Sequence, residues 1–141
     1  MTAEAKNGNR LPSSVLVVED DPVLALNIEE SLRDAGVRTI TLTTNTDDAL
    51  AALRNAPPQA IVLDVHLADR DDGWAVAELV QTLGPQRPQI IFSTGSPDEI
   101  PEEIAAAGVV LAKPYATEEL LQALREPKAR GLFSRLRNVL R

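Results

Sequence analysis

The sequence contains no cysteine among its 141 residues, which excludes disulfide bonds, thiolate metal sites and a cysteine nucleophile. Only 3% of the residues are aromatic, so the expected core consists mostly of Val, Ile, Leu and Ala. No apolar run approaches the ~20 residues that a membrane-spanning helix needs. Residues 1–12 lack the apolar core of a signal peptide, and we expect them to form a flexible leader on a cytoplasmic protein.

The net charge of −7 is distributed unevenly along the chain. From Arg125 to the end, six basic residues stand against one acidic residue, whereas the preceding body is strongly acidic. An acidic body argues against nonspecific binding to nucleic acid. The tail at 127–141 places leucines and a phenylalanine at helical spacing among arginines, and it is too short for a DNA-binding domain. We expect this basic amphipathic tail to pack on the body or on another copy in a homodimer, with a membrane or an acidic partner as alternative.

Apolar, strand-like runs alternate with helical patterns along the chain. The runs lie at 15–20, 37–42, 60–65, 89–94 and 109–113. The helices are expected to begin after Asp21, at Thr46, near Trp74, near Pro101 and at a capping Thr117. Continuous apolar runs are typical of parallel strands that are buried on both faces. Five β–α units in this order predict one α/β domain, a doubly wound five-stranded parallel sheet.

Polar side chains stand at the carboxyl ends of these runs. Glu19 and Asp20 end the first run, Asp64 follows AIVL, Thr94 follows QIIFS, and Lys113 follows VVLA. Because ligands bind at the carboxyl edge of an open parallel sheet, these side chains should converge on one site. Three carboxylates, a hydroxyl and an ammonium group would suit a divalent cation together with a phosphoryl group.

Each of these groups has a chemical role that fits such a site. The carboxylate of Asp64 can act as a nucleophile toward phosphorus, although a lone aspartate at a strand end could equally cap a turn. Glu19 and Asp20 offer the oxygen ligands that Mg²⁺ prefers. The ammonium of Lys113 can neutralise phosphoryl oxygens, and the hydroxyl of Thr94 can donate a hydrogen bond to one of them.

At these residues the sequence resembles the receiver domains of bacterial two-component response regulators. The matching motifs are VLVVEDD at 15–21, IVLDVHL at 61–67, Thr94-Gly95 and Lys113-Pro114. The resemblance covers about residues 13–126 and implies a flavodoxin-like (βα)5 receiver domain.

The resemblance also implies functional roles. Asp64 would accept a phosphoryl group from a histidine kinase or a histidine phosphotransfer protein, and the domain would signal through a downstream protein partner. Glu19, Asp20 and Asp64 would bind Mg²⁺, with the backbone carbonyl of His66 completing the metal site. Thr94 and Lys113 would contact the phosphoryl group. Receivers promote their own phosphorylation and dephosphorylation, so a turnover enzyme is not expected.

The sequence departs from the family pattern at three places. Many receivers carry an aromatic switch residue three positions before the lysine, where this chain has Val110. The loop HLADRDDGW after Asp64 lacks the usual proline, and we interpret its three aspartates as a solvated loop and not as a metal cluster. The fourth strand reads FSTG, which resembles the FATGUY group of receivers found in stress-signalling pathways of Alphaproteobacteria.

Three functions from different classes are weighed. The first is a stand-alone receiver that is phosphorylated on Asp64. The second is a flavodoxin-like binder of a nucleotide or flavin, which would need a glycine-rich loop where this chain reads EDDPV. The third is a receiver-like module that binds partners without phosphorylation, which the intact set of Asp64, Thr94 and Lys113 argues against. We favour the first.

Overall fold

The computed structural model of this chain describes residues 10–65 and 74–126. Residues 1–9 of the expected leader, His66 with the acidic loop, and the basic tail at 127–141 lie outside the described residues. The predictions made for them therefore stay predictions. Among the helices of the described part, none is long and apolar enough to cross a membrane.

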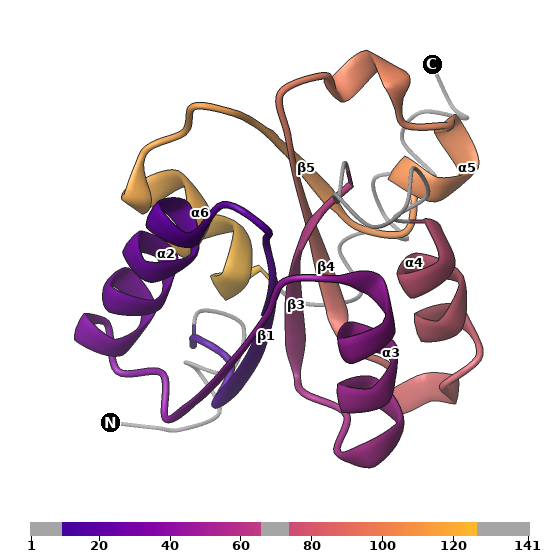
Figure 1. Ribbon diagram of the computed structural model, residues 1–141, viewed down its shortest axis with the longest axis horizontal. Helices are drawn as coiled ribbons and strands as arrows, with labels where there is room; N and C mark the ends of the chain where they lie inside the picture. The colour runs from indigo at the N-terminus through magenta and orange to yellow at the C-terminus, as the bar shows by residue number, and fades with distance from the viewer. Residues whose placement is uncertain (1–9, 66–73, 127–141) are drawn as a thin grey trace.

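Strands and helices alternate along the described chain, as the hydrophobic pattern predicts (Figure 1). The strands are β1 (Ser14–Val18), β2 (Thr39–Thr43), β3 (Ala60–Asp64), β4 (Gln89–Thr94) and β5 (Val109–Ala112). The helices are α2 (Pro22–Asp34), α3 (Thr46–Asn55), α4 (Trp74–Gln81), α5 (Glu102–Ala105) and α6 (Thr117–Arg125). Two short 3-10 helices are η2 (Gly84–Gln86) and η3 (Pro97–Glu99).

The strands form one five-stranded parallel sheet in the order β2-β1-β3-β4-β5. Helices α2 and α6 cover one face of this sheet, and α3, α4 and α5 cover the other (Figure 1). Every residue of the central strand β3 is buried, whereas the edge strands β2 and β5 are partly exposed. The predicted doubly wound α/β fold is therefore confirmed.

Two hydrophobic clusters, one on each face, hold the layers together. The cluster under α2 and α6 includes Val15, Val17, Ile28, Leu32, Val62, Ile91, Leu120 and Leu124. The cluster under α3, α4 and α5 includes Leu16, Val18, Leu53, Ile61, Leu63, Val80 and Phe92. Burial of each large side chain contributes about 1.5–3 kcal/mol relative to its exposure. Strand residues alternate between the two clusters, and this alternation decides which face each polar strand-end residue meets.

The start of α2 follows the sequence pattern closely. Asp21 is its cap, because its Oδ1 accepts hydrogen bonds from the backbone N–H groups of Val23 (3.0 Å) and Leu24 (3.3 Å). Pro22 occupies the first helical position, where a missing N–H costs nothing. The interpretation of Asp21 as a helix cap is confirmed.

The start of α6 differs from the sequence prediction by one position. Thr117 is the first helical residue and not the cap, which is Ala116. The backbone N–H of Ala116 donates a 2.8 Å hydrogen bond to Oε1 of Glu119, which lies in the first turn. A glutamate reaching back to the cap residue satisfies one of the donors that a helix start leaves unpaired, so a hydroxyl at the cap is not required.

Gly108 allows β5 to enter the sheet closely beside β4. A Cβ atom at this position would overlap the backbone carbonyl oxygen of Ile90. A side chain here would push the start of β5 away from β4. Gly108 therefore helps to fix the strand whose end carries Lys113.

Candidate functional site

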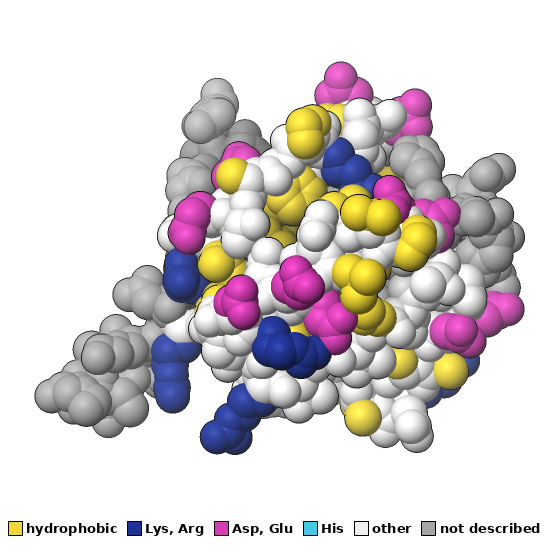
Figure 2. Space-filling view, turned by 60° about the vertical axis from the view of Figure 1, so that its left-hand side comes forward, with side chains coloured by type: hydrophobic (Ala, Val, Ile, Leu, Met, Phe, Trp, Pro, Cys, Tyr) yellow, Lys and Arg dark blue, Asp and Glu magenta, His cyan; other side chains and the backbone are white. Residues whose placement is uncertain are grey.

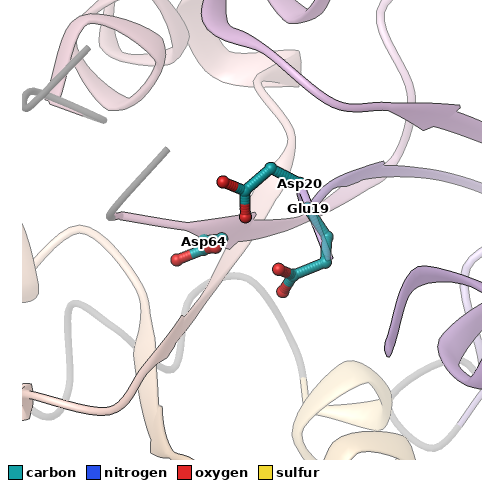
Figure 3. A group of neighbouring side chains, drawn as sticks. All are labelled: Glu19, Asp20 and Asp64. Atoms are coloured by element: carbon teal, nitrogen blue, oxygen red, sulfur yellow. The ribbon is translucent and has the colours of Figure 1, made fainter. Parts of the chain in front are cut away.

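Three carboxylates meet at the carboxyl edge of the sheet. Glu19 and Asp20 directly follow β1, and Asp64 is the last residue of β3. Figure 3 shows their carboxylates turned toward one another, and one oxygen from each lies within 4.8 Å of the others. Glu19 is only 2% exposed and Asp64 only 4%, whereas Asp20 is half-buried. The parallel pairing of β1 with β3 brings these residues together across the sequence.

Lys113 extends from the end of β5 into the same cluster. Its Nζ lies 3.1 Å from Oε1 of Glu19 and 3.7 Å from Oδ2 of Asp64. Its backbone N–H donates a 2.7 Å hydrogen bond to the carbonyl oxygen of Thr94, which fixes the start of the side chain against β4. The structure thus brings together four of the predicted side chains: Glu19, Asp20, Asp64 and Lys113.

The crowding of charge changes how these groups ionise. Burial raises the pKa of Glu19 from 4.5 to about 7; the backbone N–H of Asp21 opposes this rise, and the carboxylate of Asp64 adds to it. Burial alone would lower the pKa of Lys113, but the carboxylates of Asp64 and Glu19 outweigh it and leave that pKa raised. The lysine therefore stays charged, while Glu19 can hold a proton near neutral pH.

The donor set fits a hard divalent cation. When all four groups are ionised, three carboxylates and one ammonium leave a formal charge of −2 in a mostly buried space. Oxygen ligands from a few carboxylates, completed by water, are what Mg²⁺ takes in proteins. The residues present, Glu19, Asp20 and Asp64, are therefore compatible with Mg²⁺. His66, whose backbone carbonyl is the further predicted ligand, lies outside the described residues.

Thr94 lies close to the acid cluster, but its side chain leaves the sheet on a different face. It is the fully buried last residue of β4, and its Oγ1 accepts a 2.9 Å hydrogen bond from the backbone N–H of Ser96. The pairing of β3 with β4 places Ser93, not Thr94, beside Asp64. Because side chains alternate along a strand, Thr94 starts from the opposite face of the sheet. A phosphoryl contact from its hydroxyl remains a prediction.

Sequence reasoning missed a pair of hydroxyl side chains next to the acids. The Oγ of Ser93 lies 2.9 Å from the phenolic oxygen of Tyr115, which stands two residues after Lys113. Burial raises the pKa of Tyr115, so its hydroxyl stays protonated. The alternation of the fourth strand, which puts Ser93 on the face of Asp64, could have placed this hydroxyl near the acids but does not indicate its contact with Tyr115.

Comparison with known proteins decides the family. The family model for the response regulator receiver domain matches residues 15–125. The chain belongs to the response regulator receiver family. This assignment confirms the family suggested by the strand-end motifs.

Curated relatives of the receiver are regulatory proteins. It is 34% identical over 116 residues to the probable transcriptional regulatory protein TcrX of Mycobacterium tuberculosis, covering 81% of this chain and 49% of the relative. It is 28% identical over 108 residues to the phyllosphere-induced regulator PhyR of Methylorubrum extorquens, covering 74% of this chain and 39% of the relative. The chain spans about half the length of these relatives or less, so the receiver corresponds to one part of them.

A solved structure of a similar protein contains a metal. The receiver is 29% identical to the receiver domain of sensor histidine kinase PA1611 from Pseudomonas aeruginosa PAO1, with a TM-score of 0.67. The match covers 81% of this chain and 98% of that domain, which is described with a magnesium ion coordinated in its active site cleft.

Proposed function

We propose that this receiver accepts a phosphoryl group on Asp64 in a Mg²⁺-dependent reaction and works as a stand-alone signalling module. The observation that carries the proposal is the cluster of Glu19, Asp20 and Asp64, with Lys113 at 3.7 Å from Asp64. A carboxylate with a purely structural role would need one partner. The cluster instead concentrates excess negative charge beside the buried carboxylate of Asp64. Such a site suits binding of a cation and a phosphoryl group.

The proposed chemistry is phosphoryl transfer from a phosphohistidine. A carboxylate oxygen of Asp64 attacks phosphorus, the P–N bond to the donor histidine breaks, and the leaving imidazole takes up a proton. Enzymatic phosphoryl transfer depends mainly on positioning and on charge neutralisation. Lys113 supplies a fixed positive charge beside Oδ2 of Asp64. Bound Mg²⁺, held by Glu19, Asp20 and Asp64 with the carbonyl of His66, would neutralise further charge.

Thr94 is proposed to contact the phosphoryl group on Asp64. The Oγ1 of Thr94 accepts a hydrogen bond from the backbone N–H of Ser96. This bond uses a lone pair of Oγ1 and not the hydroxyl proton of Thr94. After a rotation of the side chain, that proton could be donated to a phosphoryl oxygen on Asp64. Such a rotation would release the N–H of Ser96 and disturb the turn leading into η3, which links the site to the 96–107 segment.

A partner protein must reach the acid cluster to deliver its phosphoryl group. The proposed donor is a histidine kinase or a histidine phosphotransfer protein. Val23 and Leu26, on the first two turns of α2, are large hydrophobic side chains that are 67% and 54% exposed. Figure 2 shows hydrophobic side chains among acidic and basic ones on the side of the molecule that carries α2 and α6. These exposed side chains, close in sequence to Glu19 and Asp20, support a protein contact at the mouth of the site.

The regulatory relatives support signalling through a protein partner. TcrX is named a probable transcriptional regulatory protein, and PhyR a phyllosphere-induced regulator. A PhyR described as a stress response regulator, 29% identical to this receiver, also supports the proposal of a role in stress signalling. Signal output without an aromatic switch at Val110 is a separate part of the proposal. A homodimer, with the basic tail at 127–141 on the acidic body, is a further part of the proposal.

Phosphorylation by a small donor tests this function. The protein should gain the mass of one phosphoryl group on incubation with acetyl phosphate and Mg²⁺, and none in the presence of a chelator. The Asp64→Asn variant should gain none, whereas Asp34→Asn, which changes an exposed aspartate at the end of α2, should match the parent. No mass gain by the parent, despite measurable Mg²⁺ binding, would instead favour a module that works without phosphorylation.

A further inference from the structure

The Ser93–Tyr115 hydroxyl pair lies beside the acid cluster and has no part in the chemistry proposed above. Ser93 is fully buried, and its Oγ lies 2.9 Å from the hydroxyl of Tyr115. The β3–β4 register sets Ser93 opposite Asp64, so both side chains leave the sheet on the α2–α6 side. The hydroxyl pair therefore adjoins the proposed phosphoacceptor from within the core.

The segment that carries Lys113 lies at the edge of the sheet. Strand β5 is an edge strand and its residues are partly or fully exposed; within the described part of the chain it pairs with β4 alone. After β5, the chain is tied back to β4 by the backbone bond from Lys113 to Thr94 and by the bond between Tyr115 and Ser93. The ring of Tyr115 also packs against the hydrophobic cluster under α2 and α6. Tyr115 thus helps to anchor this segment to the central sheet, together with the β5 side chains that pack on the two clusters.

We propose that Tyr115, anchored by Ser93, is a positioning residue that holds the ammonium of Lys113 beside Asp64 for phosphoryl transfer. The inference rests on the proposed phosphorylation of Asp64. Lys113 and Tyr115 are separated only by Pro114, whose ring restricts the backbone between them. A displacement of Tyr115 is therefore passed to the base of the lysine side chain. The lysine itself has a flexible four-carbon stem, so its placement depends on that base.

Removal of either hydroxyl should slow the reaction without weakening the metal site. Tyr115→Phe and Ser93→Ala should each reduce the rate of phosphorylation by acetyl phosphate by roughly threefold to tenfold, the range expected for one net hydrogen bond. The affinity for Mg²⁺ should not change, because neither hydroxyl belongs to the group of carboxylates that could hold the ion. Tyr115→Phe should also lose thermal stability, since it leaves the buried hydroxyl of Ser93 without its partner, whereas Ser93→Ala leaves the half-buried hydroxyl of Tyr115 and should lose less.

The double variant separates positioning from a purely structural role. Replacement of both hydroxyls removes the unpaired group, so Ser93→Ala with Tyr115→Phe should recover stability toward that of the parent. Its phosphorylation rate should stay as low as that of the single variants, because the anchor is still missing. A rate that recovers together with the stability would overturn the positioning role. Ser31→Ala is the matched control, since it breaks a 3.3 Å hydroxyl contact with Thr117 between α2 and α6 that involves none of the clustered acids.

A measurement on the unphosphorylated protein keeps this inference separate from the proposed function. The chain has three lysines, at positions 6, 113 and 128, so the ¹³Cε resonance of Lys113 can be assigned with Lys113→Arg. This resonance should move in Tyr115→Phe and in Ser93→Ala, and should stay in place in Ser31→Ala. If the parent is not phosphorylated, the proposed function fails, and the resonance alone decides whether Tyr115 positions Lys113. An unchanged Lys113 resonance in both variants would overturn the inference, and so would a parent-like phosphorylation rate in them.

Discussion

The ammonium of Lys113 donates a 3.1 Å hydrogen bond to the carboxylate of Glu19, across 94 positions of sequence. The same ammonium lies 3.7 Å from Asp64, so the lysine is shared between the two buried acids. The two acids share the lysine because the parallel sheet places the carboxyl ends of β1, β3 and β5 at one edge. The charge state of Glu19 and the environment of Asp64 are therefore linked.

The stability of the metal-free protein should depend on the ionisation of Glu19. Its pKa is raised from 4.5 to about 7 by burial, so the folded state holds a proton that the unfolded state has released. This contribution is fully present below pH 4.5 and is lost as pH rises through about 7. In the presence of a chelator, the melting temperature of the parent should therefore fall as pH rises from 4.5 to about 7. Glu19→Gln should remove this part of the pH dependence. Identical pH profiles for parent and variant would contradict this assignment.

Asp20 should matter more for Mg²⁺ than its neighbour Asp21. Asp20→Asn removes a carboxylate from the cluster and should weaken Mg²⁺ binding by roughly tenfold or more. Asp21→Asn removes the same charge one position later but keeps a side chain that caps a helix well, so affinity and stability should change little. Calorimetric titration of both variants compares them directly. A larger loss of affinity in Asp21→Asn would place the metal site elsewhere.

Phosphorylation should be reported mainly by residues 94–108. Here η3 and α5 are each less than two turns long, and the Thr94–Ser96 hydrogen bond holds their start. Such a segment opens at low free-energy cost. Amide hydrogen exchange should change most in this range when the protein is phosphorylated, and Val110→Tyr should leave phosphorylation itself intact. Unchanged exchange here, with a large change confined to 128–141, would mean that the signal leaves through the tail.

Gly108→Ala should destabilise the fold. The added Cβ would overlap the carbonyl of Ile90 and force β5 away from β4, at a cost of roughly 1–3 kcal/mol typical of overpacking. Gly95→Ala is the matched control, because a Cβ at Gly95 meets no heavy atom within 4 Å. Denaturant unfolding of both variants gives the comparison. Equal stabilities would show that the backbone near Gly108 can move aside freely.

Much of the architecture could be predicted from the sequence because local patterns and tertiary structure agree. Continuous apolar runs specified the parallel strands, and the rule that strand ends share an edge brought Glu19, Asp20, Asp64 and Lys113 together. Asp21 and Pro22 specified the start of α2 through the chemistry of a helix cap. The proposed roles of Thr94 and of the carbonyl of His66 came from family resemblance, and they remain predictions.

The contacts that the sequence did not reveal depend on tertiary structure. Nothing local to Ser93 or Tyr115 indicates that their hydroxyls meet, since the contact requires β4 and the β5–α6 link to be placed first. The cap of α6 was assigned to Thr117 because hydroxyl residues are common caps, whereas Glu119 supplies the bond to the N–H of Ala116 instead. Buried side-chain networks of this kind follow from the fold and not from sequence spacing.

The identity of the phosphorylated residue decides whether Asp64 is the phosphoacceptor. After incubation with acetyl phosphate and Mg²⁺, reduction with borohydride converts an aspartyl phosphate into homoserine, which peptide mass spectrometry can locate. Homoserine is expected at position 64 and at no other aspartate, with none formed when Mg²⁺ is chelated. Homoserine at Asp20 or at another aspartate in place of Asp64, or a phosphoryl group that resists reduction, would contradict it.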